Sequence, residues 1–192
     1  STLVLDAPFV IEQGEGLKTW KPENYGKKFY GPSTLRMGIE KSRNLMTVRV
    51  AQKVGFKKIS RITNSLGIYK NVPELLSVSL GAVETTLIQL TNAYCTFVNG
   101  GKKISPIFID RIQDRRGKTI FKVENKRCIG CDKFSNSSKA YPVIEYKNKR
   151  VFSKETAYQM TSILEGAVKR GTAKKLRDLK VPIAGKTGTT NN

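Results

Sequence analysis

Residues 181–190 read Val-Pro-Ile-Ala-Gly-Lys-Thr-Gly-Thr-Thr, an apolar run followed by a lysine, a glycine and three threonines. The apolar start predicts an extended strand, on which alternate side chains face the same side. On such a strand Lys186 would supply a fixed positive charge, and Thr187 and Thr189 would supply hydroxyl donors. Gly188 would let a ligand approach the backbone closely. A strand edge with these groups is suited to binding a carboxylate, although an ordinary strand with a glycine bulge has the same pattern.

The composition favours a packed but strongly basic chain. Of the 192 residues, 39% are hydrophobic and 26% are charged, which is enough apolar material for a core. Lys and Arg number 35 against 15 Asp and Glu, a formal net charge of +20. Such a field attracts polyanions, among them nucleic acid, anionic lipid and carboxylate-rich substrates. The charge is spread along the whole chain, and no zinc-finger spacing or aromatic RNA-binding motif is present. We therefore expect no nucleic-acid partner.

The chain contains no histidine. This excludes a Ser-His-Asp triad, a Cys-His pair and any histidine-based metal site within these residues. Acyl transfer or hydrolysis would have to use Lys, Ser, Thr or carboxylates. Cys128 and Cys131 form one C-x-x-C, which lacks the second ligand pair of a zinc site. Whether these two cysteines form a disulfide is left open by the sequence, and no metal or cofactor is expected.

The periodicity predicts helices separated by glycines, together with one hairpin. Residues 1–35 are rich in Gly, Pro and aromatic residues, which favours loops and short extended pieces. The expected helices are 45–54, ended by Gly55; 57–66, with Ile59 and Ile62 facing inward; 86–98, opened by a capping box at Thr86; and 153–170, with Ser153 as N-cap. Residues 107–123 predict a hairpin with its turn at 114–117, and the polar, basic residues 124–150 predict an insertion.

A second short motif, Ser42-Arg43-Asn44, lies just before the first predicted helix. Alone it indicates no more than a helix N-cap, for which Ser and Asn are favoured. Ser-x-N and Lys-Thr-Gly are, however, two of the three signatures of penicillin-interacting serine enzymes, and here they stand in the expected order.

With these motifs, nearly the whole chain except about residues 124–150 resembles the transpeptidase domain of class A, bifunctional penicillin-binding proteins. The stretches that carry the resemblance are residues 20–25, 31–36, 42–49, 79–106, 156–173 and 184–191. The resemblance implies an α/β fold of the penicillin-binding, β-lactamase-like kind, with an antiparallel sheet flanked by helices. Residues 1–192 would form its C-terminal part, with the sheet incomplete.

The resemblance also implies an activity. Enzymes of this family cross-link peptidoglycan: a serine attacks the D-Ala-D-Ala amide of a stem peptide, and the amine of a neighbouring stem then attacks the acyl-enzyme. β-Lactams acylate the same serine. Ser42 would relay protons to the leaving nitrogen, and Asn44 would hydrogen-bond the substrate backbone and the catalytic lysine. Lys186 would set the positive potential and help orient Ser42.

The Lys-Thr-Gly-Thr stretch would bind the substrate by the same resemblance. Thr187 and Thr189 would hold the terminal carboxylate, beside Gly188, and the backbone N–H of Thr189 would be one oxyanion donor. The nucleophile is expected to lie outside this chain, because no serine here has Lys three positions later. We therefore expect the chain alone to be inactive. A glycosyltransferase domain and a membrane anchor are expected upstream, which would place the parent at the periplasmic face of the bacterial inner membrane.

Three other interpretations remain. A non-catalytic sensor or scaffold that binds murein or β-lactam would have the same motifs, and only a Ser-x-x-Lys upstream in the parent distinguishes the enzyme from it. A β-lactamase is a second alternative, but the residues around Ser42 and Ala173 resemble the synthase family far better. A basic nucleic-acid-binding domain is the third, and salt-dependent DNA binding would support it.

Overall fold

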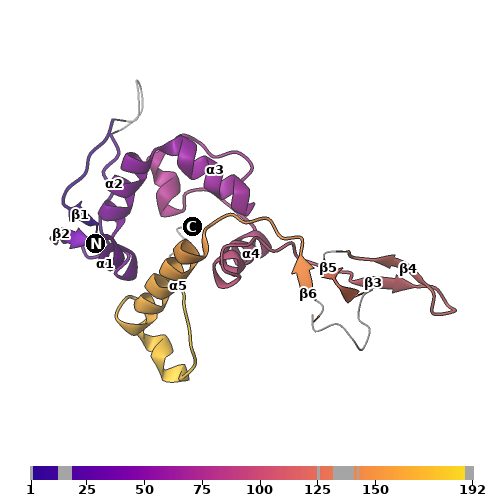
Figure 1. Ribbon diagram of the computed structural model, residues 1–192. Coiled ribbons are helices and arrows are strands. Elements are labelled where there is room, and N and C mark those ends of the chain that lie inside the picture. The colour runs from indigo at the N-terminus through magenta and orange to yellow at the C-terminus, as the bar shows by residue number, and fades with distance from the viewer. Residues whose placement is uncertain (1, 13–18, 125, 132–140, 142, 189–192) are drawn as a thin grey trace.

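The computed structural model describes residues 2–12, 19–124, 126–131, 141 and 143–188. Helices form one part of the molecule, and two hairpins extend from it to one side (Figure 1). Within the described residues the strands make three separate two-stranded antiparallel sheets, β1-β2, β3-β4 and β5-β6. Helices mixed with short antiparallel sheets agree with the predicted α/β class.

The first half of the chain surrounds the central helix α2. Strands β1 (Leu3–Asp6) and β2 (Gly31–Thr34) pair with each other, and helix α1 (Leu35–Glu40) follows directly. After α2 (Asn44–Val54), Gly55 adopts a positive φ and the chain bends into α3 (Phe56–Leu66). A 3-10 turn, η1 (Leu76–Leu80), closes this part.

The second half supplies two more helices and the hairpins. Helix α4 (Leu87–Val98) begins with the predicted capping box at Thr86, and α5 (Lys154–Lys169) begins with Ser153, whose hydroxyl accepts the Thr156 N–H. Between these helices lie β3 (Arg111–Gln113), β4 (Thr119–Lys122), β5 (Lys126–Ile129) and β6 (Val143–Tyr146); the last element is a 3-10 turn, η3 (Lys174–Leu179). The β5-β6 hairpin is the described part of the predicted insertion, whose Ser/Asn cluster at 135–138 lies outside the described residues.

The hydrophobic core lies on one face of α2. Leu45, Val48 and Ala51 of this helix pack with Phe9 and Leu76, and partly buried Trp20 and Ile59 border them. The three α2 residues recur every third position, so they lie on one face of the helix. Among the described helices, none combines the length and the apolar character needed to cross a membrane.

Two predictions about secondary structure are wrong. Ile62 was expected to face inward but is 44% exposed, because the inward side of α3 is formed by Phe56, Ile59, Thr63 and Leu66. Residues 181–188 were expected to form a strand, but they have no strand partner among the described residues. The backbone N–H of Gly185 bonds instead to the Leu164 carbonyl of α5 (3.2 Å), and a helix cannot supply the ladder that a strand requires.

A matched pair of leucines tests the position of this core. Leu45 is 0% exposed, whereas Leu87 at the start of α4 is 82% exposed. We expect Leu45→Ala to lower the free energy of unfolding by about 2 to 5 kcal/mol, because it removes buried methyl groups and leaves a cavity. Leu87→Ala should change it by less than about 0.5 kcal/mol. Urea unfolding followed by circular dichroism measures both, and equal losses would contradict a core centred on α2.

Candidate active site

Ser42 lies in a sharp turn between α1 and α2. Its N–H donates to the Ile39 carbonyl (3.1 Å), and the N–H of Arg43 donates to the Gly38 carbonyl (2.9 Å). These bonds hold Ser42 at φ 54°, in the left-handed region that residues other than glycine seldom occupy. A conformation of this kind costs on the order of 1 kcal/mol or more and persists only where the surrounding structure imposes it.

Lys186 lies beside this turn. Its Nζ donates to Ser42 Oγ (2.7 Å) and to the Thr187 carbonyl (2.8 Å). The structure therefore brings together two of the predicted site residues that are 144 positions apart in the sequence. Burial of the ammonium lowers the pKa of Lys186 below the ordinary lysine value of 10.5. A lysine that gives up its proton more readily, in contact with a serine hydroxyl, can take part in proton transfer through that hydroxyl.

Arg43, the middle residue of the Ser-x-Asn motif, is anchored on the β1-β2 sheet. Its guanidinium lies over the Tyr30 ring, 4.0 Å from the ring centre, and donates to Ser33 Oγ (2.8 Å). It also lies 3.7 Å from a carboxylate oxygen of Asp6, which is fully buried. These contacts fix the residue that follows Ser42, so the turn cannot rotate independently of the sheet.

Asn44 begins α2, and its amide points to the N-terminal loop. Its Nδ2 donates to the Glu23 carbonyl (2.9 Å), and Asn24 next in the loop accepts the Leu45 N–H (3.3 Å). The catalytic lysine of Ser-x-x-Lys, to which Asn44 was predicted to bond, is not among these residues. The role of Asn44 at that lysine and at the substrate therefore remains a prediction.

The described residues that follow Lys186, Thr187 and Gly188, lie at the surface. Thr187 and Gly188 are exposed, and a Cβ added at Gly188 would meet no atom within 4 Å. Thr187 Oγ1 lies 2.6 Å from Thr172 Oγ1, so the two hydroxyls share a hydrogen bond. Thr189, for which we predicted carboxylate binding and an oxyanion N–H, lies outside the described residues.

Three residues behind the site, Glu40, Arg170 and Thr172, were not predicted from the sequence. Glu40 is 1% exposed, and Arg170 binds both of its carboxylate oxygens, Nε to Oε2 at 3.1 Å and Nη2 to Oε1 at 2.5 Å. This contact raises the pKa of Arg170 above its ordinary value. Thr172 donates its backbone N–H to the Glu40 carbonyl (3.1 Å). Two signals were available: Glu40 lies two positions before Ser42, and Arg170-Gly171-Thr172 is part of the resemblance.

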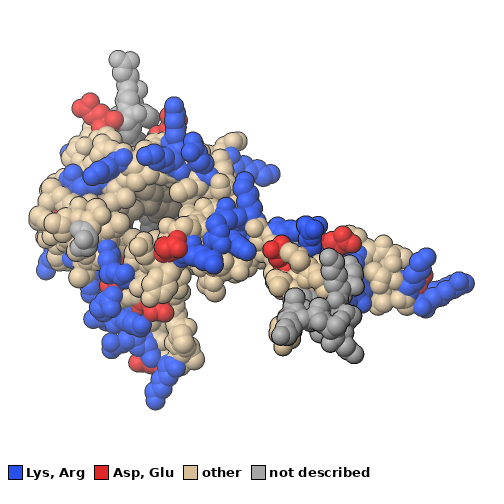
Figure 2. Space-filling view, in the orientation of Figure 1, with Lys and Arg blue, Asp and Glu red and all other residues tan. Residues whose placement is uncertain are grey.

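Basic side chains dominate the charged surface of the described residues in the view of Figure 2. Figure 2 shows Lys and Arg side chains spread over the helical part and the hairpins, with few Asp and Glu between them. Among the described residues, no group of three His, Cys, Asp or Glu side chains could hold a metal ion. The arrangement of a lysine, a serine and exposed threonine hydroxyls can bind a carboxylate and move a proton.

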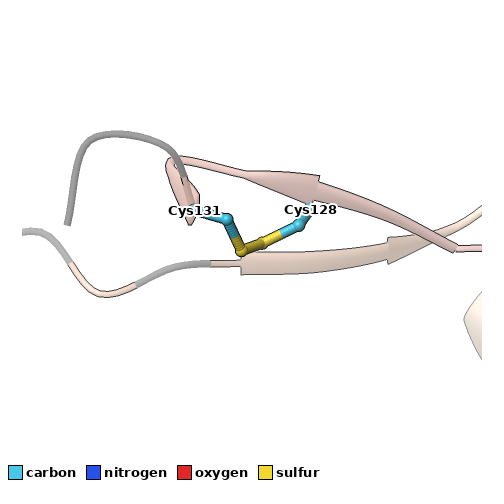
Figure 3. Close-up of a disulfide and its surroundings, with 2 residues drawn as sticks. All are labelled: Cys128 and Cys131. Atoms are coloured by element: carbon cyan, nitrogen blue, oxygen red, sulfur yellow. A yellow bond between two sulfur atoms is a disulfide. The ribbon is translucent and has the colours of Figure 1, made fainter.

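The C-x-x-C lies on the hairpin that extends from the helical part, away from Ser42. Cys128 and Cys131 form a disulfide with a Cα–Cα distance of 5.8 Å (Figure 3). The disulfide closes the turn that follows β5, where Gly130 has a positive φ. The structure thus answers the question that the sequence left open, and it separates these cysteines from the candidate active site.

Comparison with known proteins gives consistent matches. The family model described as Penicillin binding protein transpeptidase domain matches residues 2–192. Penicillin-binding protein 1A of Rickettsia bellii is 44% identical over 190 residues, which are 97% of this chain and 24% of that protein. The crystal structure of penicillin-binding protein 1A from Haemophilus influenzae has a TM-score of 0.82 at 31% identity, covering 100% of this chain and 31% of that one.

A third similar structure is penicillin-binding protein A from M. tuberculosis, solved as a ceftriaxone acyl-enzyme complex. Its TM-score is 0.72 at 18% identity, covering 100% of this chain and 43% of that one, and at this identity the likeness shows the fold alone. This chain spans about a quarter of the length of the curated relatives that it matches.

The lowered pKa of Lys186 has a measurable consequence. Below pH 10.5 the unfolded chain binds more protons than the folded one, so the free energy of unfolding should rise with pH between the folded pKa and that value. The contribution of Lys186 to the free energy of unfolding is complete above pH 10.5. It is lost as the pH falls through the pKa of Lys186 in the folded chain. Lys186→Met should flatten this slope. NMR titration of labelled lysine, assigned with Lys186→Arg, measures the pKa directly, and a midpoint at or above 10.5 would contradict the burial argument.

Proposed function

This chain belongs to the family of penicillin-binding protein transpeptidase domains, and from that premise we propose that it forms part of an enzyme that cross-links peptidoglycan stem peptides. The observation that carries the proposal is the 2.7 Å hydrogen bond from Lys186 Nζ to Ser42 Oγ. It joins the two motifs that the family shares, at a half-buried position beside open space.

The proposed reaction is acyl transfer through a serine ester. The Oγ of a nucleophilic serine bonds to the carbonyl carbon of the penultimate D-Ala, and the amide C–N bond breaks. The leaving nitrogen takes up a proton, which Ser42 relays, and the terminal D-Ala departs. The amine of a second stem peptide then replaces the serine oxygen and forms the cross-link.

The residues of this chain would form the walls of that site. Lys186 supplies positive charge and orients Ser42, while Thr187 and Thr189, beside Gly188, bind the terminal carboxylate of the stem peptide. The backbone N–H of Thr189 stabilises the oxyanion. Asn44 binds the substrate backbone next to the catalytic lysine. From membership of the penicillin-binding family we further propose that β-lactams acylate the same serine.

The nucleophile is supplied from outside these residues. No serine of the chain has Lys three positions later, so the Ser-x-x-Lys of the site would come from an upstream part of the parent protein. We also assign to the parent a glycosyltransferase domain and a membrane anchor, which place the site at the periplasmic face of the inner membrane. The net charge of +20 suits a surface that works among anionic lipids and carboxylate-bearing murein.

A non-catalytic sensor or scaffold is the second candidate. The open surface at Thr187 and Gly188 would also suit a domain that binds murein or a β-lactam without turning it over. The two candidates differ in one property, because only the enzyme needs a nucleophile within reach of Lys186.

Intact mass distinguishes these candidates. The 192-residue chain and the full-length parent are each incubated with excess benzylpenicillin. We expect one covalent adduct on the parent and none on the chain, because the chain lacks the nucleophile. An adduct on the chain itself would show that one of its own serines is the nucleophile. A folded parent without an adduct would contradict the transpeptidase and favour the sensor.

Substitution of Ser42 in the full-length parent tests the proton relay. We expect Ser42→Ala to slow acylation by benzylpenicillin about 100-fold or more, since loss of a positioned proton-transfer group costs about 10²- to 10⁴-fold. Ser65→Ala, which changes a hydroxyl that donates to the Arg61 carbonyl on α3 (2.8 Å), is the matched control and should acylate at the parental rate. Equal rates for Ser42→Ala and the control would remove Ser42 from the mechanism.

A further inference from the structure

We propose that Glu40 and the segment Arg170-Gly171-Thr172 form a positioning unit that sets Ser42 against Lys186, and that the Thr172 hydroxyl directs that of Thr187 toward the substrate carboxylate. This inference rests on the proposed function and adds residues that it does not use.

The unit is a set of contacts between the end of α1 and the end of α5. The Thr172 N–H donates to the Glu40 carbonyl (3.1 Å), and Lys41 Nζ donates to the Arg170 carbonyl (2.7 Å). The guanidinium of Arg170 also donates to both carboxylate oxygens of Glu40. Three successive residues after α5 thus lie against the two residues that precede Ser42.

Two glycines allow this close approach. A Cβ at Gly171 would overlap the Glu40 carbonyl oxygen, and a Cβ at Gly166 would overlap the Glu40 carboxylate. Glu40 can therefore lie this close because residues 166 and 171 have no side chains. Glu40 is desolvated by this contact, so it depends on Arg170 for its charge partner. Arg36 is a second partner with a longer contact, 3.6 Å from Glu40 Oε1.

Thr172 joins this unit to the substrate side of the site. Its N–H is fixed on α1, while its Oγ1 lies 2.6 Å from Thr187 Oγ1. Each hydroxyl has one proton to donate. When Thr172 donates to Thr187, the proton of Thr187 is free to point at a bound carboxylate. Thr172 is exposed, so its hydroxyl is not required to fill the core.

The same contacts determine where Ser42 lies. Since Ser42 follows Glu40 and Lys41 directly, any displacement of the end of α1 from α5 moves its Oγ away from Lys186 Nζ. The hydrogen bond between these two atoms spans 2.7 Å and would be lost with a displacement of about 1 Å.

The test is the kinetics of acylation of the full-length parent, with binding and acylation resolved. Thr172→Val keeps the shape and removes the hydroxyl. We expect it to weaken binding of benzylpenicillin about 10- to 100-fold, as for a lost hydrogen bond that serves a charged group, with little change in the acylation step. Thr172→Ser should restore binding. Against the methyl ester of benzylpenicillin, which has no carboxylate, Thr172→Val and the parent should bind equally.

The ion pair is tested in the same assay. Glu40→Gln keeps the size of the side chain and Arg170→Lys keeps the charge without the two-pronged contact. Each should slow the acylation step about 10-fold or more, because a displaced Ser42 can no longer transfer the proton efficiently. The matched control is Glu165→Gln, which changes an exposed ion pair with Lys169 (2.9 Å) on the same helix and should leave acylation unchanged.

The outcomes separate the two proposals. If the parent itself is not acylated, the proposed function fails and the positioning unit fails with it. If the parent is acylated and Thr172→Val binds both ligands as the parent does, the positioning unit alone is overturned. A second result would also overturn the positioning unit: Glu40→Gln and Arg170→Lys lose acylation only in proportion to their loss of thermal stability. The ion pair would then have a structural role alone.

Discussion

The contact between Glu40 and Arg170 is the constraint on which the arrangement of the site depends. A carboxylate that is almost fully buried must be neutralised by a partner, and here the partner comes from 130 positions further along the chain. Closing so long a loop costs conformational entropy, which local helix contacts cannot offset. The charge pair and the hydrogen bonds around it fix the end of α1 against the end of α5, and the site lies where these two segments meet.

The local structure could be predicted from the sequence because its causes are local. The capping box at Thr86, the N-cap at Ser153 and the positive φ of Gly55 are determined by a few neighbouring residues. Short α1 and η3 were not predicted, since six residues give too weak a periodic signal. Residues 181–188 were assigned to a strand on their apolar composition, but strand formation depends on a neighbour that composition does not reveal.

The candidate site was predictable only in part. Spacing gave no reason to bring Ser42 near Lys186; the resemblance to a known family did, and the hydrogen bond between them agrees with it. Glu40 and Arg170 carry no motif that would show a contact between them. A charged residue in a basic chain is expected at the surface, and its burial follows from packing of α1 on α5. The role of Gly166 and Gly171 in this packing can be inferred only when the positions of α1 and α5 are known.

The left-handed turn at Ser42 has a consequence for the chemistry of this position. Threonine carries the same hydroxyl as serine, and a proton relay would accept either. Branching at Cβ, however, makes a positive φ far more costly, and Ser42 has a φ of 54°. The backbone conformation therefore restricts the residue at position 42 more narrowly than the reaction does. Of serine and threonine, only serine, which is unbranched at Cβ, fits this turn without added strain.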